Sequence, residues 1–383
     1  MQASESVEVL ADRAAAEGRF PEAVAQLERL SAERPDDQGV WLKLSAMLRA
    51  TGQLEAALSA IDRSLALSPL DFSALLARAF LLEKMGQVGA DQAFTFAIAQ
   101  APDEEQLSPA IRKALAHARS RASTYWLEMQ QKLCRLLPPD LDGAGARRAE
   151  RLIGNVTRQT KPFVQQPTHF SYPELPTIEV HDRERFHGLE AIEAATADIQ
   201  REFDALVASR GAELVPYIQY PDQVPLRQWE ALNRNKAWSA LHLLKNGERV
   251  GANADLCPRT MELLASLDQP DVPGASPNAL FSLLAPRTRI PPHTGVANTR
   301  LVCHLPLIVP PRCGFRVGAT ELEWEVGRCF VFDDTIEHEA WNDSDALRVV
   351  LIFDLWVPDL TSADRAVARA VIVGSGGMGT EAL

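Results

Sequence analysis

Two histidines and one arginine in the last third of the chain have the types and spacing that carry the clearest chemistry. His293 opens the segment His-Thr-Gly, His338 follows 45 residues later, and Arg348 comes ten residues after that, inside the otherwise apolar run 347–353. Imidazoles at the ends of neighbouring strands can hold a non-haem Fe(II) ion. A guanidinium can grip the far carboxylate of 2-oxoglutarate as a two-pronged fork. This spacing therefore predicts an oxygenase that uses Fe(II) and 2-oxoglutarate.

A short apolar strand carries further polar residues close to the first histidine. In the run Arg-Leu-Val-Cys-His, strand alternation puts Arg300, Val302 and His304 on one face. Charged residues in an apolar strand either line a site or form structural ion pairs. We favour the site for Arg300, because it begins seven residues after His293. For Arg348 the alternative is a structural ion pair with a residue such as Asp354.

The residue two places after the first histidine is unusual for such a centre. Most 2-oxoglutarate oxygenases have Asp or Glu there as a third metal ligand, whereas this chain has Gly295. Iron would then be held by two protein atoms and bound more weakly. Water or a nearby acid could complete the site, and Asp333, Asp334 and Glu337 are the candidates. A missing carboxylate also leaves room for chloride, so radical halogenation is an alternative reaction.

Together these segments resemble the aspartyl/asparaginyl β-hydroxylase family, densely from Pro291 to Leu360 and more thinly from about residue 150. The resemblance implies a double-stranded β-helix, or jelly roll, with Fe(II) and 2-oxoglutarate as cofactors. It also implies the roles of six residues. These are metal ligation by His293 and His338, binding of the far carboxylate of 2-oxoglutarate by Arg348 and Ser282, approach to the co-substrate near the metal by His304, and contact with substrate by Arg300.

The resemblance further implies hydroxylation of the β-carbon of Asp or Asn in a peptide or protein. One departure bears on the substrate: well-known members carry a second arginine where this chain has Val302, and that arginine helps to engage an acidic side chain. Strict specificity for aspartate is therefore in doubt. Hydroxylation of a lipid or small molecule is an alternative, and so is a non-catalytic scaffold that has kept the fold alone.

The first hundred residues repeat with a period of 34. Gly18, Gly52 and Gly86 keep this spacing, and so do the pairs Ala23 with Ala57 and Pro35 with Pro69. The pattern resembles the tetratricopeptide repeat, in which glycine ends the first helix of a pair, alanine allows close packing and proline ends the second helix. Such arrays commonly bind a peptide or a protein partner. A spacer without a bound partner is the alternative.

The chain is therefore predicted to be an α+β multidomain protein. We expect an all-helical repeat domain at residues 1–136, a Pro/Gly-rich linker at 137–150, a catalytic domain at 151–361 and a flexible tail at 362–383. Residues 187–209 predict one long helix, and the segment from about 278 predicts mostly short strands.

Composition sets limits on the class of protein. The 383 residues are 46% apolar and 23% charged, and the net charge of −12 argues against nucleic acid as a partner. We expect no membrane span and no signal peptide. Five cysteines without CxxC spacing favour reduced thiols and a cytoplasmic location. His181 and His187 are expected at the surface, and His242 as a packed or pocket-wall residue.

Overall fold

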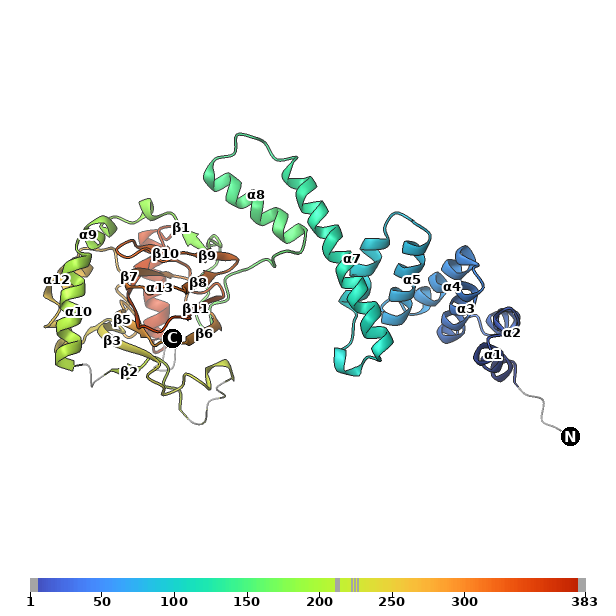
Figure 1. Cartoon of the computed structure of the whole chain (residues 1–383). Helices are drawn as coiled ribbons and strands as arrows, with labels where there is room; N and C mark the ends of the chain where they lie inside the picture. Colours follow the sequence, from blue (N-terminus) through green and yellow to red (C-terminus); the bar gives the residue numbers. More distant parts are fainter. Residues whose placement is uncertain (1–5, 211–213, 222, 224, 226, 378–383) are drawn as a thin grey trace. The chain divides into compact units, whose positions relative to one another are not determined.

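The computed structural model describes residues 6–210, 214–221, 223, 225 and 227–377. The chain divides into two compact units, Met1–Lys161 and Pro162–Leu383, and each is described by itself (Figure 1). The division falls later than the predicted linker at 137–150. Helix α8 (Gly143–Val156) occupies much of that segment, because Asp142 caps it despite the prolines and glycines nearby.

The first unit consists of paired helices, as the period of 34 residues predicted. The helices are α1 (Val7–Ala16), α2 (Phe20–Glu33), α3 (Gln38–Ala50), α4 (Leu54–Leu67), α5 (Phe72–Lys84), α6 (Ala90–Ala99), the 3-10 turn η1 (Glu104–Gln106), α7 (Pro109–Cys134) and α8. Gly18, Gly52 and Gly86 have positive φ angles of 73°, 81° and 64°, and each lies two residues beyond the end of the first helix of its pair. That backbone conformation suits glycine.

Small residues let the paired helices approach closely. Ala23 and Ala57, which keep the repeat spacing, are completely buried. Aspartates cap the first helices of the second and third pairs: Asp37 accepts from Gly39 N–H and Asp71 from Ala74 N–H. The repeat therefore determines both where these helices begin and how they pack.

The second unit contains most of the strands and a set of covering helices. The strands are β1 (Val180–His181), β2 (Val215–Pro216), β3 (Trp238–Lys245), β4 (Glu248–Arg249), β5 (Ala279–Leu284), β6 (Thr288–His293), β7 (Arg300–Ile308), β8 (Cys313–Val317), β9 (Thr320–Leu322), β10 (Phe330–Phe332), β11 (His338–Asn342) and β12 (Arg348–Trp356). The helices are η2 (Arg183–Arg185), α9 (Leu189–Ala194), α10 (Thr196–Arg210), η4 (Arg227–Trp229), α11 (Gly251–Ala254), α12 (Pro258–Ala265) and α13 (Ser362–Gly374).

These strands form two antiparallel sheets. The larger has the order β1-β10-β7-β12-β5-β3-β2, with β4 paired to β3, and the smaller has the order β6-β11-β8-β9. Apolar side chains of both sheets share one core, as where Val302 and Phe332 of the large sheet join Phe315 of the small one. The prediction of an antiparallel, sheet-rich domain is confirmed at this level. The specific jelly-roll topology stays a prediction.

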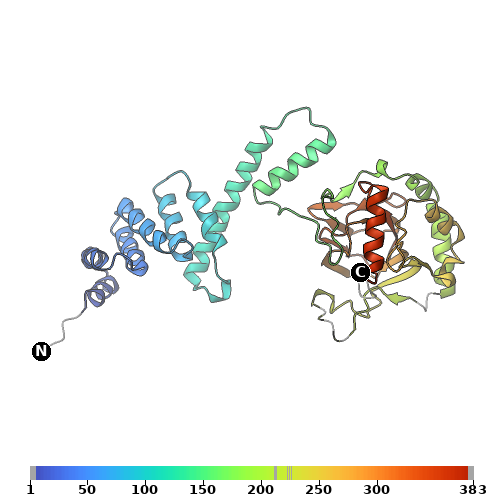
Figure 2. The ribbon, with the colours of Figure 1, turned by 180° about the vertical axis from the view of Figure 1, so that it is seen from behind.

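Strand alternation gives the large sheet two different faces. On β7, Leu301, Cys303 and Leu305 pack with the helices, in the same cluster as Ile199 of α10 and Ile372 of α13. In both views α10 and α12 lie side by side, and Figure 2 shows α13 in front of the sheets (Figures 1 and 2). The opposite face of the strand, with Arg300, Val302 and His304, is left for the space between the sheets.

Three local predictions need correction. The tail predicted at 362–383 is wrong for residues 362–374, which form α13 with a Thr361–Asp364 capping box and a buried Ile372; residues 378–383 lie outside the described residues. The glycine run 374–379 concealed that amphipathic stretch. His181 is buried in β1 rather than exposed, whereas His187 is exposed as expected. The helix predicted at 187–209 is interrupted at Ala195.

Among the described helices, none is both long and apolar enough to cross a membrane.

Candidate active site

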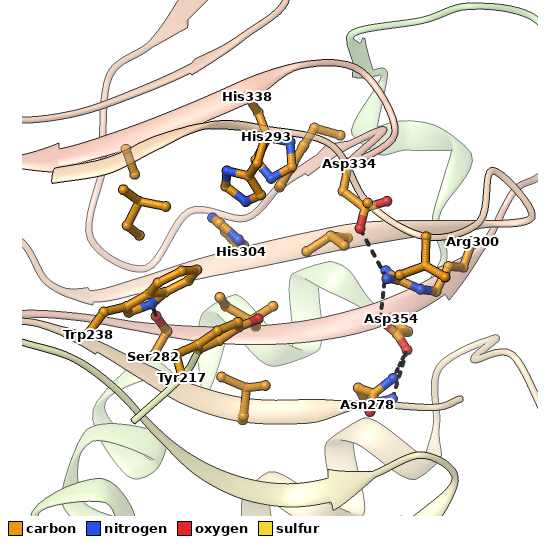
Figure 3. A pocket seen from close by; sticks show the side chains of 18 of the residues that line it. Tyr217, Trp238, Asn278, Ser282, His293, Arg300, His304, Asp334, His338 and Asp354 are labelled. Atoms are coloured by element: carbon orange, nitrogen blue, oxygen red, sulfur yellow. Dashed lines mark hydrogen bonds and ion pairs between the residues drawn. The ribbon is translucent and has the colours of Figure 1, made fainter. Parts of the chain in front are cut away.

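The two predicted metal ligands lie beside each other on the small sheet. His293 ends β6, His338 begins β11, and the two residues are directly opposite in the antiparallel pair. Their ring centroids are 4.0 Å apart (Figure 3). A single ion requires imidazole nitrogens at about 2.0–2.3 Å, so this spacing meets the requirement that both rings reach one site. The ligand role itself stays a prediction.

Backbone carbonyls orient both rings. His293 Nδ1 lies 2.8 Å from the Pro291 carbonyl oxygen, and His338 Nδ1 lies 3.0 Å from that of Ile336. Donation from Nδ1 to these carbonyls leaves Nε2 of each ring as the free acceptor, which is the usual arrangement of metal-binding histidines. Burial lowers the pKa of His293 to about 4 and that of His338 well below its ordinary value. Both rings are therefore neutral at pH 7, the form that binds metal.

The space beside Gly295 is filled by a carboxylate from elsewhere in the chain. A Cβ added at Gly295 would collide with the carboxyl group of Asp334, whose backbone carbonyl accepts from Gly295 N–H at 2.6 Å. Within the part of the chain that the structure describes, no group of three or more His, Cys, Asp or Glu residues is arranged to hold a metal. A metal centre that relies on two histidines stays a prediction.

Of the three acids considered for completing the site, Asp334 alone lines the cavity. Burial raises its pKa to about 6. Asp333 instead accepts hydrogen bonds from Gln165 Nε2 at 2.6 Å and from Thr335. Glu337 forms an ion pair with Arg316 at 3.1 Å.

Arg348 is a buried cation without a counter-charge in the described structure. Its side chain is 1% exposed, and no hydrogen bond or ion pair to a described residue reaches it. The guanidinium carbon lies 5.2 Å from the ring centre of Trp324. Burial lowers the pKa of Arg348 to about 10. Because an unpaired buried charge is costly, this position favours an anionic ligand.

Ser282, the predicted partner of Arg348, lies on the same face of the large sheet. Ser282 lies opposite Val350, two residues along β12 from Arg348. The indole N–H of Trp238 donates to Ser282 Oγ at 3.1 Å, so the serine O–H remains free to donate elsewhere. Tyr217 stacks on Trp238 with ring centroids 3.9 Å apart and planes at 6°. In Figure 3 these groups lie on one side of His304.

Aromatic rings surround His304. Its ring lies 5.0 Å from Phe332 and 5.3 Å from Phe315, and it stacks at 5.8 Å on Trp324. Burial and then the nearby Arg348 charge lower the pKa of His304 well below its ordinary value. A neutral imidazole in this apolar wall can hydrogen-bond to a ligand while excluding water.

One cavity of about 200 Å³ between the sheets brings all the predicted site residues together. Its lining includes His293, His338, Ser282, His304, Arg300 and Arg348. Tyr217 and Trp238 also line the cavity but were not predicted from the sequence, because they come from segments far from the histidines. Their aromatic character was the available signal, but nothing in the local pattern linked them to the site.

Arg300 lines this cavity but is not free. Its guanidinium lies 3.1 Å from an Asp334 oxygen and 3.3 Å from an Asp354 oxygen, and all three side chains are at most 9% exposed. Asp354 also accepts from Ser276 Oγ at 2.6 Å and from Asn278 N–H at 2.8 Å. Asp354, which the sequence offered as an alternative ion-pair partner of Arg348, thus pairs with Arg300 instead.

Comparison with known proteins matches both units. Residues 193–358 match the family model described as "Aspartyl/Asparaginyl beta-hydroxylase", and residues 14–79 match a tetratricopeptide-repeat model. An "Ornithine lipid ester-linked acyl 2-hydroxylase" from Rhizobium tropici is 30% identical over 207 residues, which are 53% of this chain and 69% of the relative. The chain belongs to the aspartyl/asparaginyl β-hydroxylase family.

Other members of the family align with the same part of the chain. "Aspartate beta-hydroxylase domain-containing protein 2" from Xenopus tropicalis is 31% identical over 231 residues, 59% of each chain. The human "Aspartyl/asparaginyl beta-hydroxylase" is 35% identical over 144 residues, 37% of this chain and 19% of that protein. The chain thus spans little more than half of the first of these relatives. Each of these relatives is named as a hydroxylase or as containing a hydroxylase domain.

Proposed function

We propose that the protein is an Fe(II)- and 2-oxoglutarate-dependent hydroxylase. The observation that carries this proposal is one cavity that holds two neutral imidazoles with free Nε2 atoms and a buried guanidinium that has no counter-ion among the described residues. The imidazoles fit a divalent metal, and the guanidinium fits a dicarboxylate co-substrate.

In this proposal each group has a defined task. Iron, dioxygen and 2-oxoglutarate would together supply this chemistry: one atom of dioxygen would enter the C–OH group that replaces an unactivated C–H bond, and the other would enter succinate as 2-oxoglutarate loses CO2. His293 and His338 hold the metal through Nε2. Arg348 binds the far carboxylate with two parallel N–H donors, and Ser282 adds its O–H because its oxygen already accepts from Trp238. His304 and its aromatic neighbours orient the co-substrate and exclude water.

For the substrate we propose an Asp or Asn side chain in a peptide or protein, hydroxylated at the β-carbon. The family description and the tetratricopeptide match support this choice, because repeat arrays commonly bind polypeptides. The helical unit would then bind the substrate protein or a separate partner. A cytoplasmic location remains a prediction.

A lipid acyl chain is a second candidate substrate. The similarity to the ornithine lipid hydroxylase, over 69% of that relative, favours it. The two classes can be separated by offering peptides and acyl lipids side by side and identifying the oxygenated product by mass spectrometry.

The test of the proposed reaction is succinate release from 2-oxoglutarate in the presence of Fe(II). We expect release by the native chain and none by His338→Ala. His187→Ala is the matched control, because His187 is exposed and outside the cavity lining. Equal release by the native chain and His338→Ala would contradict the proposed centre, and so would absence of release from the native chain.

A further inference from the structure

The side of the cavity that holds Arg300 carries an excess of negative charge. Arg300 lies between the carboxylates of Asp334 and Asp354, at 3.1 and 3.3 Å. One guanidinium thus faces two buried acids. To bind a carboxylate of the substrate, Arg300 would have to give up one of these partners, and the incoming group would face the acid it displaced.

The neighbouring position on the strand adds no positive charge. Val302 lines the cavity and lies directly opposite Asp354 on β12 and opposite Phe332 on β10. An arginine at this position would stand beside Asp354 and could pair with it. With valine there, Asp354 depends on Arg300 together with Ser276 and Asn278.

The other cations of the described lining lie elsewhere. Arg348 belongs to the co-substrate end, beside Ser282 and Trp238. Lys245 is the exposed last residue of β3 and lies toward the Arg300 end of the large sheet, because the preceding Leu244 is in one cross-strand row with Ala279, Phe353 and Cys303. One cross-strand row runs from His242 on β3 through Leu280 on β5 and Ile352 on β12 to His304 on β7. Strand β3 is therefore three strands from β7. That separation is about 14 Å at normal strand spacing. A substrate carboxylate beside β7 would therefore be three strands away from Lys245, and Arg300, already paired with two acids, is the described lining cation beside it.

We infer that the side chain hydroxylated by this protein is uncharged: of the two residues named by the family, asparagine and not aspartate. This inference rests on the proposed function. The specificity comes from the commitment of Arg300 to Asp334 and Asp354 and from the absence of a cation at residue 302. A carboxamide enters this environment without a net charge, whereas a carboxylate is repelled by both acids.

The inference is tested by binding, with Mn(II) in place of iron and N-oxalylglycine in place of 2-oxoglutarate, so that no turnover is needed. Two pools of 13-residue peptides are offered to the full chain, one with Asn and one with Asp at the centre and both with the same randomised flanks. Retained peptides are counted by mass spectrometry. We expect the Asn pool to be retained at least about tenfold more than the Asp pool.

Two substitutions at one position sharpen the test. Val302→Arg supplies a second guanidinium beside Asp354 and should move the Asn-to-Asp ratio toward Asp by at least about tenfold. Val302→Met is the matched control, since it adds length without charge and should keep the native ratio. Asp354→Asn, which removes one partner of Arg300, should move the ratio in the same direction as Val302→Arg. Thermal unfolding checks that each variant is folded.

Equal retention of the pools, a preference for Asp or retention of neither pool by the native chain would overturn the inference. The inference would also be overturned if Val302→Arg, Val302→Met and Asp354→Asn all kept the Asn-to-Asp ratio of the native chain. Failure of the proposed function is recognised separately, because it appears as absence of succinate release with Fe(II) and 2-oxoglutarate, whatever the pools show.

Discussion

Among the described residues, both units have exposed ion pairs, but the buried charged side chains all belong to the sheet unit. In the helical unit, ion pairs such as Arg78 with Asp62 lie at the surface, with side chains 36% and 50% exposed. In the sheet unit, Arg300 and Asp334 are 9% and 8% exposed, and Arg348 is 1% exposed without a partner in the described residues. Exposed pairs contribute little to stability, whereas buried charges are costly when their partners are incomplete.

The two units therefore differ in whether their stability depends on buried charges. In the helical unit the apolar residues form the packed core and the charged side chains are exposed to water. We therefore expect its stability not to depend on a ligand. The sheet unit keeps an uncompensated charge inside its core at Arg348, and under the proposed function an anion bound there would offset that cost. Changes at buried charges should therefore affect stability and activity in opposite directions, and changes in the repeats should not.

The largest effect is expected at Arg348. Replacement by Met should lower 2-oxoglutarate turnover at least about 100-fold, because the two-pronged carboxylate contact is lost. The same change should raise the melting temperature of the ligand-free protein by a few degrees, since an unpaired buried charge disappears. Succinate assays and calorimetry measure the two effects. Arg119→Met, at an exposed pair with Glu104, should change neither; a lower melting temperature for Arg348→Met would break the comparison.

Removal of residues 1–161 should separate the tasks of the two units. We expect uncoupled turnover of 2-oxoglutarate to remain within about twofold, because all six predicted site residues lie in the sheet unit. Hydroxylation of the protein substrate should fall at least about tenfold if the repeats bind that substrate. Circular dichroism of the truncated protein checks its fold. Undiminished hydroxylation would mean that the repeats have another role.

Acid should destabilise the sheet unit. Burial lowers the pKa of His181 and of His242 to about 4 in each case. As the pH falls below 6.5, these histidines bind protons in the unfolded chain but stay neutral in the folded protein. The free energy of unfolding should therefore fall between pH 6.5 and pH 4. For His181 the loss amounts to about 3 kcal/mol. Asp334, whose pKa is raised by burial, acts in the opposite direction over part of this range.

Urea unfolding at pH 7 and pH 4.5 measures this dependence. His181→Asn should reduce it, and His117→Asn in the helical unit, where the side chain is exposed, should not. A pH dependence that His181→Asn leaves unchanged would assign the acid sensitivity to other groups.

A packing change in the repeats should reduce stability without touching the site. Ala57 is completely buried at a helix contact, so Ala57→Leu should destabilise the helical unit by about 1–3 kcal/mol. Uncoupled 2-oxoglutarate turnover should stay unchanged. Chemical unfolding and the succinate assay test the two statements, and reduced turnover would show that the site depends on repeat packing.

The smallest effect is expected at a surface pair of the same unit. Arg78→Ala removes the 2.7 Å contact with Asp62, and the free energy of unfolding should change by less than about 0.5 kcal/mol. A loss of several kcal/mol would show that surface charges matter in the repeats as well.

The same contrast explains how much the sequence could predict. The helical unit depends on contacts between residues close in sequence, so the spacing of Gly18, Gly52 and Gly86 was sufficient for its helix pairs. His293, His338 and Arg348 were predicted from their types and spacing, and Ser282 from the family resemblance; all four line one cavity, and their roles stay predictions. The expected tail at 362–383 failed since its glycines outweighed the amphipathic pattern that forms α13.

Strand register, in contrast, could not be read from spacing. The pairing of Asp354 with Arg300 rather than with Arg348 depends on how β12 lies against β7. The stacking of Tyr217 on Trp238 likewise depends on the pairing of β2 with β3. Such contacts join segments far apart in the chain, and one sequence carries no direct signal for them.

The close fit of Gly295 against Asp334 limits the order in which these two positions can change. An acidic residue introduced at 295 would collide with the carboxylate already there. A descendant of this chain can therefore acquire a ligand at 295 only if the Asp334 carboxylate moves away or residue 334 becomes smaller, and either change would disturb the ion pair with Arg300. Each single step loses an interaction before the second restores one. If the site holds a metal on two histidines, as proposed, that arrangement is a local optimum from which a three-ligand centre is reached only through a weaker intermediate.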